Sequence, residues 1–360
     1  MTELPGGEQQ VLDRIDRTRR ARPRLKETLV TSAHGAGGKA SRTLVETVFL
    51  DALDNATLAA MEDQATFPVG SSRLALSTDA FVVSPLFFPG GSIGDLAVNG
   101  TVNDLAMAGA RPLHLAASFI LEEGFPIDDL RRIVAAMATA ARVARVDIVT
   151  GDTKVVQRGK ADGCYVTTTG VGLIEHECSL AASRLMPGAQ LIVSGPVGDH
   201  GTTVMLARGQ LDLEADVVSD TAPLFEPVET LLRAAPGTLC LRDATRGGVA
   251  TILNEWAIAS DTAVVVDEDA VPVRAAVRGA CEILGIDPLY VACEGRFVAA
   301  VPAEQTDATL AALRSLPLTA DAAVIGEVRD DPPGMVLLRT GFGGTRVLDM
   351  LIGDPLPRIC

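Results

Sequence analysis

The sequence has none of the features that would place it in a membrane, in the secretory pathway or on nucleic acid. No apolar stretch reaches the roughly 18 residues that a membrane-spanning helix needs, and the richest, 81–89, is interrupted by Ser84, Pro85 and Pro89. Residues 1–14 lack the apolar core of a secretory signal. With 31 Lys and Arg against 46 Asp and Glu, the net charge is −15, so the body of the protein matches anionic polymers and membranes poorly. We expect a soluble cytoplasmic protein that binds neither nucleic acid nor membrane.

The six cysteines include no C-x-x-C pair, which argues against a zinc ribbon or a disulfide framework. Five are predicted to be small core or loop residues. The sixth, Cys360, is the last residue, and Pro355 and Pro357 favour an extended chain before it. A thiol at the tip of such an arm can be carried into another protein's active site and returned. The alternative is an incidental cysteine at a frayed end.

Lysine is also scarce, with only Lys26, Lys39, Lys154 and Lys160 in the chain. A sequence that mostly uses arginine has reason to keep lysine where a compact amine that can lose its proton is useful. Lys39 and Lys154 both lie in polar segments that contain glycine. They are therefore candidates for chemistry, with chance retention as the alternative.

Hydrophobic periodicity predicts an α/β protein of two domains. Residues 1–27 are basic and are expected to form a flexible arm, with partner docking as the alternative. In the next part we expect a strand at 73–78, helices at 96–108 and 127–146, and strands at 147–150 and 165–174. After a turn at 186–188 we expect helices at about 200–209, 222–234, 247–260, 273–284 and 305–315, and strands at 191–194, 263–267, 297–302, 323–328, 335–340 and 346–350. These elements predict domains at 28–180 and 181–352, a tail at 353–360, and a site in the cleft between the domains.

A glycine-rich segment, His34-Gly35-Ala36-Gly37-Gly38-Lys39, is the first candidate for ligand binding. Successive small residues let backbone N–H groups turn toward an anion, and Lys39 can add a point charge. The segment is not a P-loop, because alanines at 33 and 40 replace the required Gly and Ser or Thr. It predicts phosphate binding by Gly37, Gly38 and Lys39, with a flexible surface loop as the alternative.

Acidic residues recur at the ends of apolar segments. They are Asp63, Asp79, Asp104, Asp152 and Asp243. Magnesium takes oxygen ligands and commonly shares them between carboxylates and nucleotide phosphates. Several aspartates beside a glycine-rich loop therefore suit Mg–ATP, although each alone could be a cap or turn residue.

Three further features suggest polar chemistry. Asp95, Asn99 and Asn103 form a stripe on an otherwise apolar helix and need partners, of which a ligand is one possibility. The charged residues of 152–163 predict an active-site loop beyond a strand. Glu294 stands between apolar residues and a glycine, where burial would raise its pKa and make it a candidate base. A structural carboxylate paired with arginine is the alternative for Glu294.

Taken together, several segments are similar to one family. They are 77–85, 88–91, 100–107, 151–156, 198–201, 243–248 and 357–360. From about residue 28 to the end, the chain resembles the HypE family of hydrogenase maturation factors, with the terminal Pro-Arg-Ile-Cys, the Asn-Asp pair at 103–104 and Asp-Thr-Lys at 152–154 as the most specific matches.

The resemblance implies a two-domain α/β (α+β) architecture like that of aminoimidazole ribonucleotide synthetase, a homodimer paired through the N-terminal sheets, and ATP with Mg²⁺ in the cleft. It also implies a carbamoyl dehydratase. A partner carbamoyltransferase would load a carbamoyl group onto Cys360, and ATP-dependent dehydration would convert it to a thiocyanate. The cyanide would then pass to the iron scaffold of the [NiFe]-hydrogenase assembly complex.

Residue by residue, the resemblance assigns Glu294 as the base and Lys154 to charge stabilisation or proton transfer, both beside Cys360. It assigns Mg²⁺ and phosphate to Asp63, Asp79, Asp104 and Asp243. For the nucleotide cleft it implies Gly37, Gly38, Lys39, Asn103, Gly151, Asp152 and Arg246. Two residues depart from the family pattern: Cys293 replaces the usual Asn, and Ala244 replaces the usual Pro in a loop expected to be looser for it.

Two other functions compete with this one. A small-molecule kinase or synthetase of the same superfamily, similar to selenophosphate synthetase, would use the same cleft without needing Cys360. A non-catalytic ATP-binding scaffold would use the tail only to dock a partner.

Overall fold

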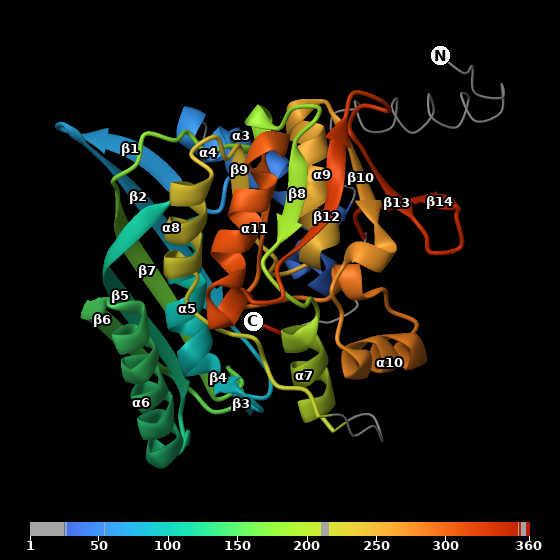
Figure 1. Ribbon diagram of the computed structural model, residues 1–360. Helices are drawn as coiled ribbons and strands as arrows, with labels where there is room; N and C mark the ends of the chain where they lie inside the picture. The colour runs from blue at the N-terminus through green and yellow to red at the C-terminus, as the bar shows by residue number, and fades with distance from the viewer. Residues whose placement is uncertain (1–24, 26, 54, 210–215, 352, 354–357) are drawn as a thin grey trace.

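The computed structural model describes residues 25, 27–53, 55–209, 216–351, 353 and 358–360. The basic arm predicted at 1–27 lies outside the described residues except for residues 25 and 27. Figure 1 shows two sheets, each with helices packed against it. One has the strand order β1-β2-β7-β5-β6 and the other β14-β13-β10-β12-β8-β11-β9. Both mix parallel and antiparallel pairs.

The strands of the first sheet are β1 (Ala65–Val69), β2 (Ser72–Phe81), β5 (Ala110–Glu122), β6 (Asp147–Val156) and β7 (Cys164–Ile174), and β3 (Phe87–Phe88) pairs with β4 (Gly91–Ser92). Those of the second are β8 (Gln190–Val193), β9 (Cys240–Asp243), β10 (Ala263–Asp267), β11 (Phe297–Val301), β12 (Ala323–Arg329), β13 (Met335–Arg339) and β14 (Thr345–Val347).

The α-helices are α2 (Lys39–Leu44), α3 (Leu50–Leu53), α4 (Ala56–Ala59), α5 (Ile93–Met107), α6 (Ile127–Ala144), α7 (Asp199–Ala207), α8 (Phe225–Ala234), α9 (Gly248–Ser260), α10 (Ala275–Leu284) and α11 (Thr306–Arg314). Shorter helical turns are η1 (Ser32–Gly35), η2 (Val45–Phe49), η3 (Ala182–Arg184), η4 (Glu268–Ala270), η5 (Pro288–Tyr290), η6 (Ala303–Gln305) and η7 (Pro317–Thr319).

Among the described residues, helices cover only one face of the first sheet (Figure 1). Side chains alternate along its strands, so Ala75, Leu115 and Val166 are buried toward α5 and α6. The opposite face carries large apolar side chains that remain exposed, among them Leu76 and Ile120. An uncovered apolar sheet face is typical of a surface that pairs with another protein.

Helix α5 connects the two parts of the molecule. It is apolar on nearly every side and 14 of its 15 residues are buried, as expected for a helix enclosed by protein. Its polar side chains bond to other residues of the chain, although the side-chain oxygen of Asn99 is buried with no hydrogen-bond partner among the described residues. Ser92 donates to Asp95 (2.7 Å), Asn99 donates to Thr221 (3.1 Å), and Asn103 bonds the backbone of the second part of the chain. The stripe therefore holds the two parts together.

The second sheet is covered on both faces. Trp256 of α9 lies in a core cluster with Val264 and Val336, whereas Leu231 of α8 and Leu313 of α11 lie in another with Phe297. Residues of β8 alternate between these clusters. The sheet is thus a central layer between helices, and the ends of its strands near α5 contribute to the site described below (Figure 1).

The structure confirms an α/β class with two mixed sheets and corrects one local prediction. The first part of the active-site loop expected at 152–163 is strand, because β6 continues through Val156 and pairs in parallel with β5, whereas 157–163 form the connection from β6 to β7. Within the described residues, no helix has the length and apolar character needed to cross a lipid bilayer.

Candidate active site

A cavity of about 140 Å³ brings together seven of the predicted site residues, drawn from both parts of the chain and from the C-terminus. They are Asp63, Asp79, Asp104, Asp243, Arg246, Glu294 and Cys360. Ala80, Phe81, Gly100 and Thr245 complete the lining. The sequence separates these residues by up to 297 positions, so the fold alone makes them neighbours.

Three of the four aspartates lie on helices or strands, and Asp63 lies in the connection before β1. Asp79 lies on β2, two residues after Ser77, so both side chains point toward α5. There Ser77 donates a hydrogen bond to Asp104 of α5. Asp243 ends β9. Asp63 is held by Arg242, whose guanidinium contacts it at 2.6 Å and Glu255 at 2.8 Å.

The aspartate cluster has the composition of a divalent-cation site. Oxygens of Asp63, Asp104 and Asp243 all lie within 4.8 Å of one another. Burial, together with the charges of neighbouring aspartates, raises the pKa values of Asp104 and Asp243 well above the usual range. Burial raises the pKa of Asp79 too, although Arg246 opposes that shift. The second oxygen of Asp243 is buried without a hydrogen-bond partner. Repelling carboxylates with an unsatisfied oxygen fit a hard cation such as Mg²⁺.

Glu294 is a buried carboxyl held in place through its backbone. Its N–H donates to Asp220 (2.9 Å), and its carbonyl accepts from Asn103 (3.2 Å). Burial raises the pKa of Glu294 well above its usual range, and Asp243, Asp220 and Asp79 raise it further. One side-chain oxygen is buried without a partner. The raised pKa makes the Glu294 carboxylate a stronger proton acceptor than an exposed carboxylate, so the group is a candidate general base.

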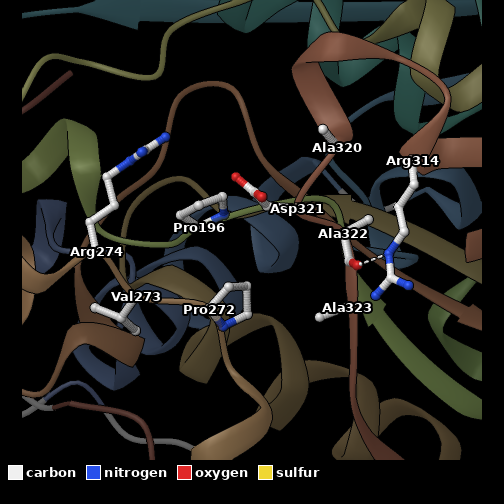
Figure 2. Close-up of a pocket in the computed structure, with 9 residues that line it drawn as sticks. All are labelled: Pro196, Pro272, Val273, Arg274, Arg314, Ala320, Asp321, Ala322 and Ala323. Atoms are coloured by element: carbon white, nitrogen blue, oxygen red, sulfur yellow. Dashed lines mark hydrogen bonds between the residues drawn. The ribbon is translucent and has the colours of Figure 1, made fainter.

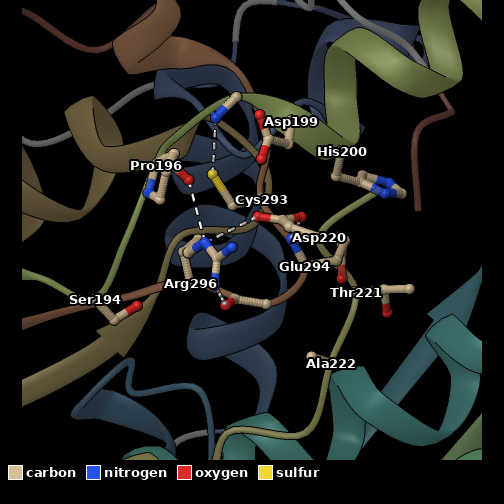
Figure 3. Close-up of polar contacts among 12 residues, drawn as sticks. Ser194, Pro196, Asp199, His200, Asp220, Thr221, Ala222, Cys293, Glu294 and Arg296 are labelled. Carbon is tan, nitrogen blue, oxygen red and sulfur yellow. Dashed lines mark hydrogen bonds and ion pairs between the residues drawn. The ribbon is translucent and has the colours of Figure 1, made fainter. Parts of the chain in front are cut away.

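Behind Glu294 lies an ionic cluster in which Arg296 and Asp220 meet (Figure 3). Arg296 also donates to the carbonyls of Pro196 (3.2 Å) and Gly295 (3.1 Å). Burial raises the pKa of Asp220 to about 6, with Arg296 opposing the shift. This cluster fixes the chain on both sides of Glu294.

The two departures from the family pattern are accommodated locally. The Cys293 thiol accepts a hydrogen bond from the Gly198 N–H (3.2 Å), as Figure 3 shows. The loop at Ala244 is not looser, contrary to expectation, because it is bonded on both sides. Its N–H donates to Arg296 (2.8 Å) and its carbonyl accepts from the Cys293 N–H (2.8 Å). A proline at 244 could not make the first of these bonds.

The end of the chain is docked. The Val82 N–H donates to the Cys360 carbonyl (3.0 Å) and the Ser84 N–H donates to the Arg358 carbonyl (3.1 Å). The Ile359 side chain is buried with Phe81, Val83 and Phe88. These contacts carry Cys360 into the cavity. The tail was predicted to be mobile, but its last three residues are held in the site here, and 354–357 lie outside the described residues.

The glycine-rich segment lies beside the cavity. Gly37 lies against Arg246, and at its positive φ of 74° a side chain would be strained and would also meet the Arg246 carbonyl. A Cβ at Gly38 would collide with the Leu351 carbonyl. The Lys39 ammonium pairs with Asp349 at 2.6 Å. The segment is therefore near the site, with the Lys39 charge directed to Asp349.

Four predicted site residues lie elsewhere in this chain. The Asn103 side chain is occupied by the backbone of Ala222 (3.1 Å), Leu224 (2.8 Å) and Glu294, so it joins the two parts of the molecule instead of facing a ligand. Gly151 allows β6 to approach the Ala117 carbonyl. Asp152 and Lys154 pair with each other at 2.5 Å on β6, where both side chains are mostly exposed.

Two of the cavities that are larger than the acidic cavity bear on the assignment of the site. One, of about 480 Å³, adjoins the acidic cavity and shares Asp63 with it; residues of α4, β1 and β2, including Leu58, Ala65 and Leu76, line it. The other, of about 460 Å³, is lined by Arg274, Arg314, Asp321 and neighbouring residues of the second part of the chain (Figure 2). It contains none of the predicted site residues.

Comparisons with known proteins agree with the geometry. Residues 61–174 match the family described as AIR synthase related protein, N-terminal domain, and residues 186–338 match its C-terminal domain. The chain is 52% identical over 338 residues to the carbamoyl dehydratase HypE of Cupriavidus necator, covering 93% of this chain and 96% of the relative. The chain belongs to the HypE family.

Solved structures of HypE proteins share the whole fold. HypE from a HypE–HypF complex superposes with a TM-score of 0.82 at 44% identity, covering 86% of this chain and 99% of that one. A hydrogenase maturation protein HypE in complex with ATP gives a TM-score of 0.78 at 46% identity, covering 92% and 100%.

Sequence reasoning did not assign roles to several residues around the HypE-type site. Arg242 and Ser77 hold the aspartates, and Asp220 holds Glu294. His200 contacts the docked tail. Ser77 and His200 lay in segments that the sequence had marked, 77–85 and 198–201, but nothing in their spacing indicated a role.

Proposed function

We propose that this chain dehydrates a carbamoyl group carried on the Cys360 thiol to a thiocyanate, using ATP, as a step in making the cyanide ligands of a [NiFe]-hydrogenase in the cytoplasm. The observation that carries the proposal is the docked tail. It sets the terminal thiol in the same cavity as a buried carboxyl and an aspartate cluster. A small-molecule kinase would have no use for that placement.

The chemistry requires a leaving group and a base. The oxygen of a thiocarbamate leaves poorly, and transfer of the γ-phosphoryl group of ATP to it gives a phosphate ester that leaves well. Breaking that C–O bond while the C≡N bond forms releases phosphate, and both N–H protons of the carbamoyl group must be removed. Glu294, lining the cavity with Cys360, is the group we assign to accept a proton. Its raised pKa makes its carboxylate a stronger base than an exposed one.

We assign Asp63, Asp104 and Asp243 to hold Mg²⁺, with Asp79 beside them. The proximity of their oxygens and the unsatisfied oxygen of Asp243 support this. When bound there, Mg²⁺ would offset the negative charge of the transferring phosphoryl group. Ser77 bonds Asp104 and Arg242 bonds Asp63, so these two carboxylates are held in orientation with or without a bound cation.

We place the nucleotide across the acidic cavity and the adjoining 480 Å³ cavity. Asp63 lines both cavities. If the phosphates lie near the aspartates, the larger, apolar cavity is available for the nucleobase. Gly37 lies against Arg246, which lines the acidic cavity, and Gly38 and Lys39 follow it in the chain. A change of partner by Lys39, from Asp349 to a phosphate, would close this segment over the nucleotide.

We also propose a homodimer paired through the exposed face of the first sheet. Cross-strand register places Lys154 beside Ile120 and Asp152 beside Ser118, so both polar residues belong to that uncovered face. They lie on the edge strand β6, and the cavity that adjoins the aspartates lies at the opposite edge, by β1 and β2. A two-fold axis through the sheet would bring β6 of one copy over β1 and β2 of the other. Lys154 and Asp152 would then serve the partner's site.

The partners follow from the reaction. The tail must leave the cavity to receive its carbamoyl group from a carbamoyltransferase, and a HypE relative has been crystallised with HypF. After dehydration the tail must deliver the cyano group to an iron scaffold.

The test is to incubate the protein with carbamoyl phosphate, ATP, Mg²⁺ and the partner carbamoyltransferase, and to measure the mass of the C-terminal peptide by mass spectrometry. We expect a carbamoyl adduct on Cys360 that loses one water to become a cyano adduct, and Cys360→Ala should carry neither adduct while still binding ATP. ATP consumption with an unmodified tail would instead support the small-molecule kinase, and no turnover would support the scaffold.

A further inference from the structure

The docked tail is held mainly through its backbone. Arg208 donates from its side chain to the carbonyls of Ser84 (2.9 Å) and Arg358 (2.9 Å), which joins the tail to the segment it lies along. Arg358 pairs with Asp162 at 2.6 Å, but both side chains are 40% exposed or more, where ion pairs contribute little. The remaining carbonyl, that of Ile359, is bound by His200 at 2.7 Å. This bond is the most deeply buried of the tail contacts, since His200 has no exposed surface.

The surroundings of His200 fix which of its nitrogens carries the proton. A backbone carbonyl can only accept, so Nε2 must be the donor toward Ile359. Burial lowers the pKa of His200 to about 4, so the ring is neutral near pH 7 and Nδ1 has no hydrogen. Nδ1 therefore accepts from the Ser219 hydroxyl (2.8 Å), and that hydroxyl accepts in turn from the Thr221 N–H (3.2 Å). Phe88 packs edge-on against the ring, with centroids 5.4 Å apart.

The same short loop reaches the candidate base. Ser219 is followed by Asp220, whose carboxylate accepts from the Glu294 N–H (2.9 Å). Hydrogen bonds thus connect the Ile359 carbonyl to His200 and His200 to Ser219. The next residue, Asp220, is hydrogen-bonded to the backbone of Glu294. Figure 3 shows His200, Asp220 and Glu294, which come from three different segments of the chain.

We propose that His200 and Ser219 form the anchor of the docked tail, and that through Asp220 this anchor keeps Glu294 in place opposite Cys360. His200 is then a positioning residue. It grips the backbone of the residue before the thiol, so it can hold the tail whether the thiol is bare, carbamoylated or cyanated. The part that concerns Glu294 rests on the proposed function, whereas the anchor itself does not.

The anchor can be tested by proteolysis without any turnover. Trypsin cleaves after Arg358, and the docked tail protects that bond because the Arg358 carbonyl is bound by Ser84 and Arg208. In His200→Asn the side-chain amide reaches only the position of Nδ1, so the Ile359 carbonyl loses its donor. In His200→Gln the amide can reach the position of Nε2. We expect release of the Ile-Cys dipeptide to rise roughly tenfold in His200→Asn and to return to within about threefold of wild type in His200→Gln.

Three comparisons keep the test decisive. Arg242 lies on β9 and pairs with β11, so cleavage after it requires the sheet to open and reports global unfolding. The rate of cleavage after Arg358 divided by the rate of cleavage after Arg242 therefore reports on the tail alone. Ser219→Ala removes the donor to Nδ1 and should raise the ratio by about threefold. Asp162→Asn breaks only the exposed ion pair and should change it by less than about twofold. An unchanged ratio in His200→Asn, or equal ratios in the Asn and Gln variants, would overturn the anchor.

The link to Glu294 needs a loaded protein. Carbamoylated His200→Asn should dehydrate more slowly than wild type, by the same factor by which its tail cleavage rises. His200→Gln should dehydrate at close to the wild-type rate. If wild type dehydrates and the Asn variant matches it despite a released tail, the link to Glu294 is wrong and the anchor stands. If wild type itself does not dehydrate, the proposed function fails while the proteolysis result is unaffected.

Discussion

The Glu294 carboxyl lies close to three aspartates, and its charge state depends on theirs. Burial and the charges of Asp243, Asp220 and Asp79 favour its protonated form. A cation bound by the aspartates would reduce that repulsion and release the proton. A cation at the aspartates would therefore favour the base form of Glu294, and this would couple proton removal to a filled nucleotide site.

Glu294→Gln keeps the shape of the side chain and removes the base. We expect the variant to accept a carbamoyl group on Cys360 at the normal rate and to accumulate it, with dehydration reduced by about 10²-fold or more. Mass spectrometry of the C-terminal peptide measures both forms. A normal yield of the cyano form would remove Glu294 from the role of base.

We expect the aspartate cluster to lower the stability of the protein when no cation is bound to it. In Asp243→Asn one of the mutually repelling carboxylates becomes neutral, so we expect the metal-free protein to gain roughly 1 kcal/mol, or about 2–4 °C in Tm. The increase in Tm on adding Mg²⁺ and ATP should disappear. Thermal unfolding with and without Mg–ATP measures both effects. A destabilised variant that keeps the full ligand-induced shift would contradict the cluster as the cation site.

At the scale of single elements, α5 carries the joint between the two parts of the chain. Asn103→Ala removes three hydrogen bonds and leaves the buried Leu224 N–H without its partner, which should cost roughly 2–4 kcal/mol. Asn99→Ala, one turn away, loses a single bond to Thr221 and should cost about 1 kcal/mol. Chemical denaturation compares the two variants, and equal losses would show that the Asn103 bonds do not hold the joint.

The elements that could be predicted were those whose pattern is local. Helix α6 has one apolar stripe and ends within two residues of its predicted end. Strand β5 was missed because Arg111 and His114 interrupt its apolar residues, and only pairing with β6 and β7 on both sides makes it a strand. Strand β6 was cut short because its charged residues resemble a loop, although an edge strand with an exposed face tolerates them.

Some residues of the site could likewise be predicted from the sequence, and others could not. The aspartates and Glu294 could be proposed from residue type and from the family resemblance, because those residues carry the chemistry directly. Ser77, Asp220 and His200 act through hydrogen bonds to residues distant in sequence. No pattern along the chain records such contacts, so only the folded structure reveals them.

At the scale of the whole molecule, the position of Lys154 is informative. It lies across the sheet from the cavity of its own chain, so a role beside Cys360 requires a second copy. Cys360→Ala and Lys154→Ala should each be inactive alone. Mixed dimers should regain activity, because one of the two sites combines an intact thiol with an intact lysine. Activity of the mixture after subunit exchange measures this. No recovery would place Lys154 in its own chain's site, and full activity of Lys154→Ala alone would place it outside the mechanism.

The most direct measurement uses protein already carbamoylated on Cys360 and freed of the carbamoyltransferase. Mg²⁺ and ATP are added, and the mass of the C-terminal peptide is followed together with ADP. We expect the adduct to lose one water as one ADP forms for each chain converted, and neither change should occur in Glu294→Gln. ATP turnover with the carbamoyl group intact would contradict the claim that this cavity dehydrates the group that the tail carries into it.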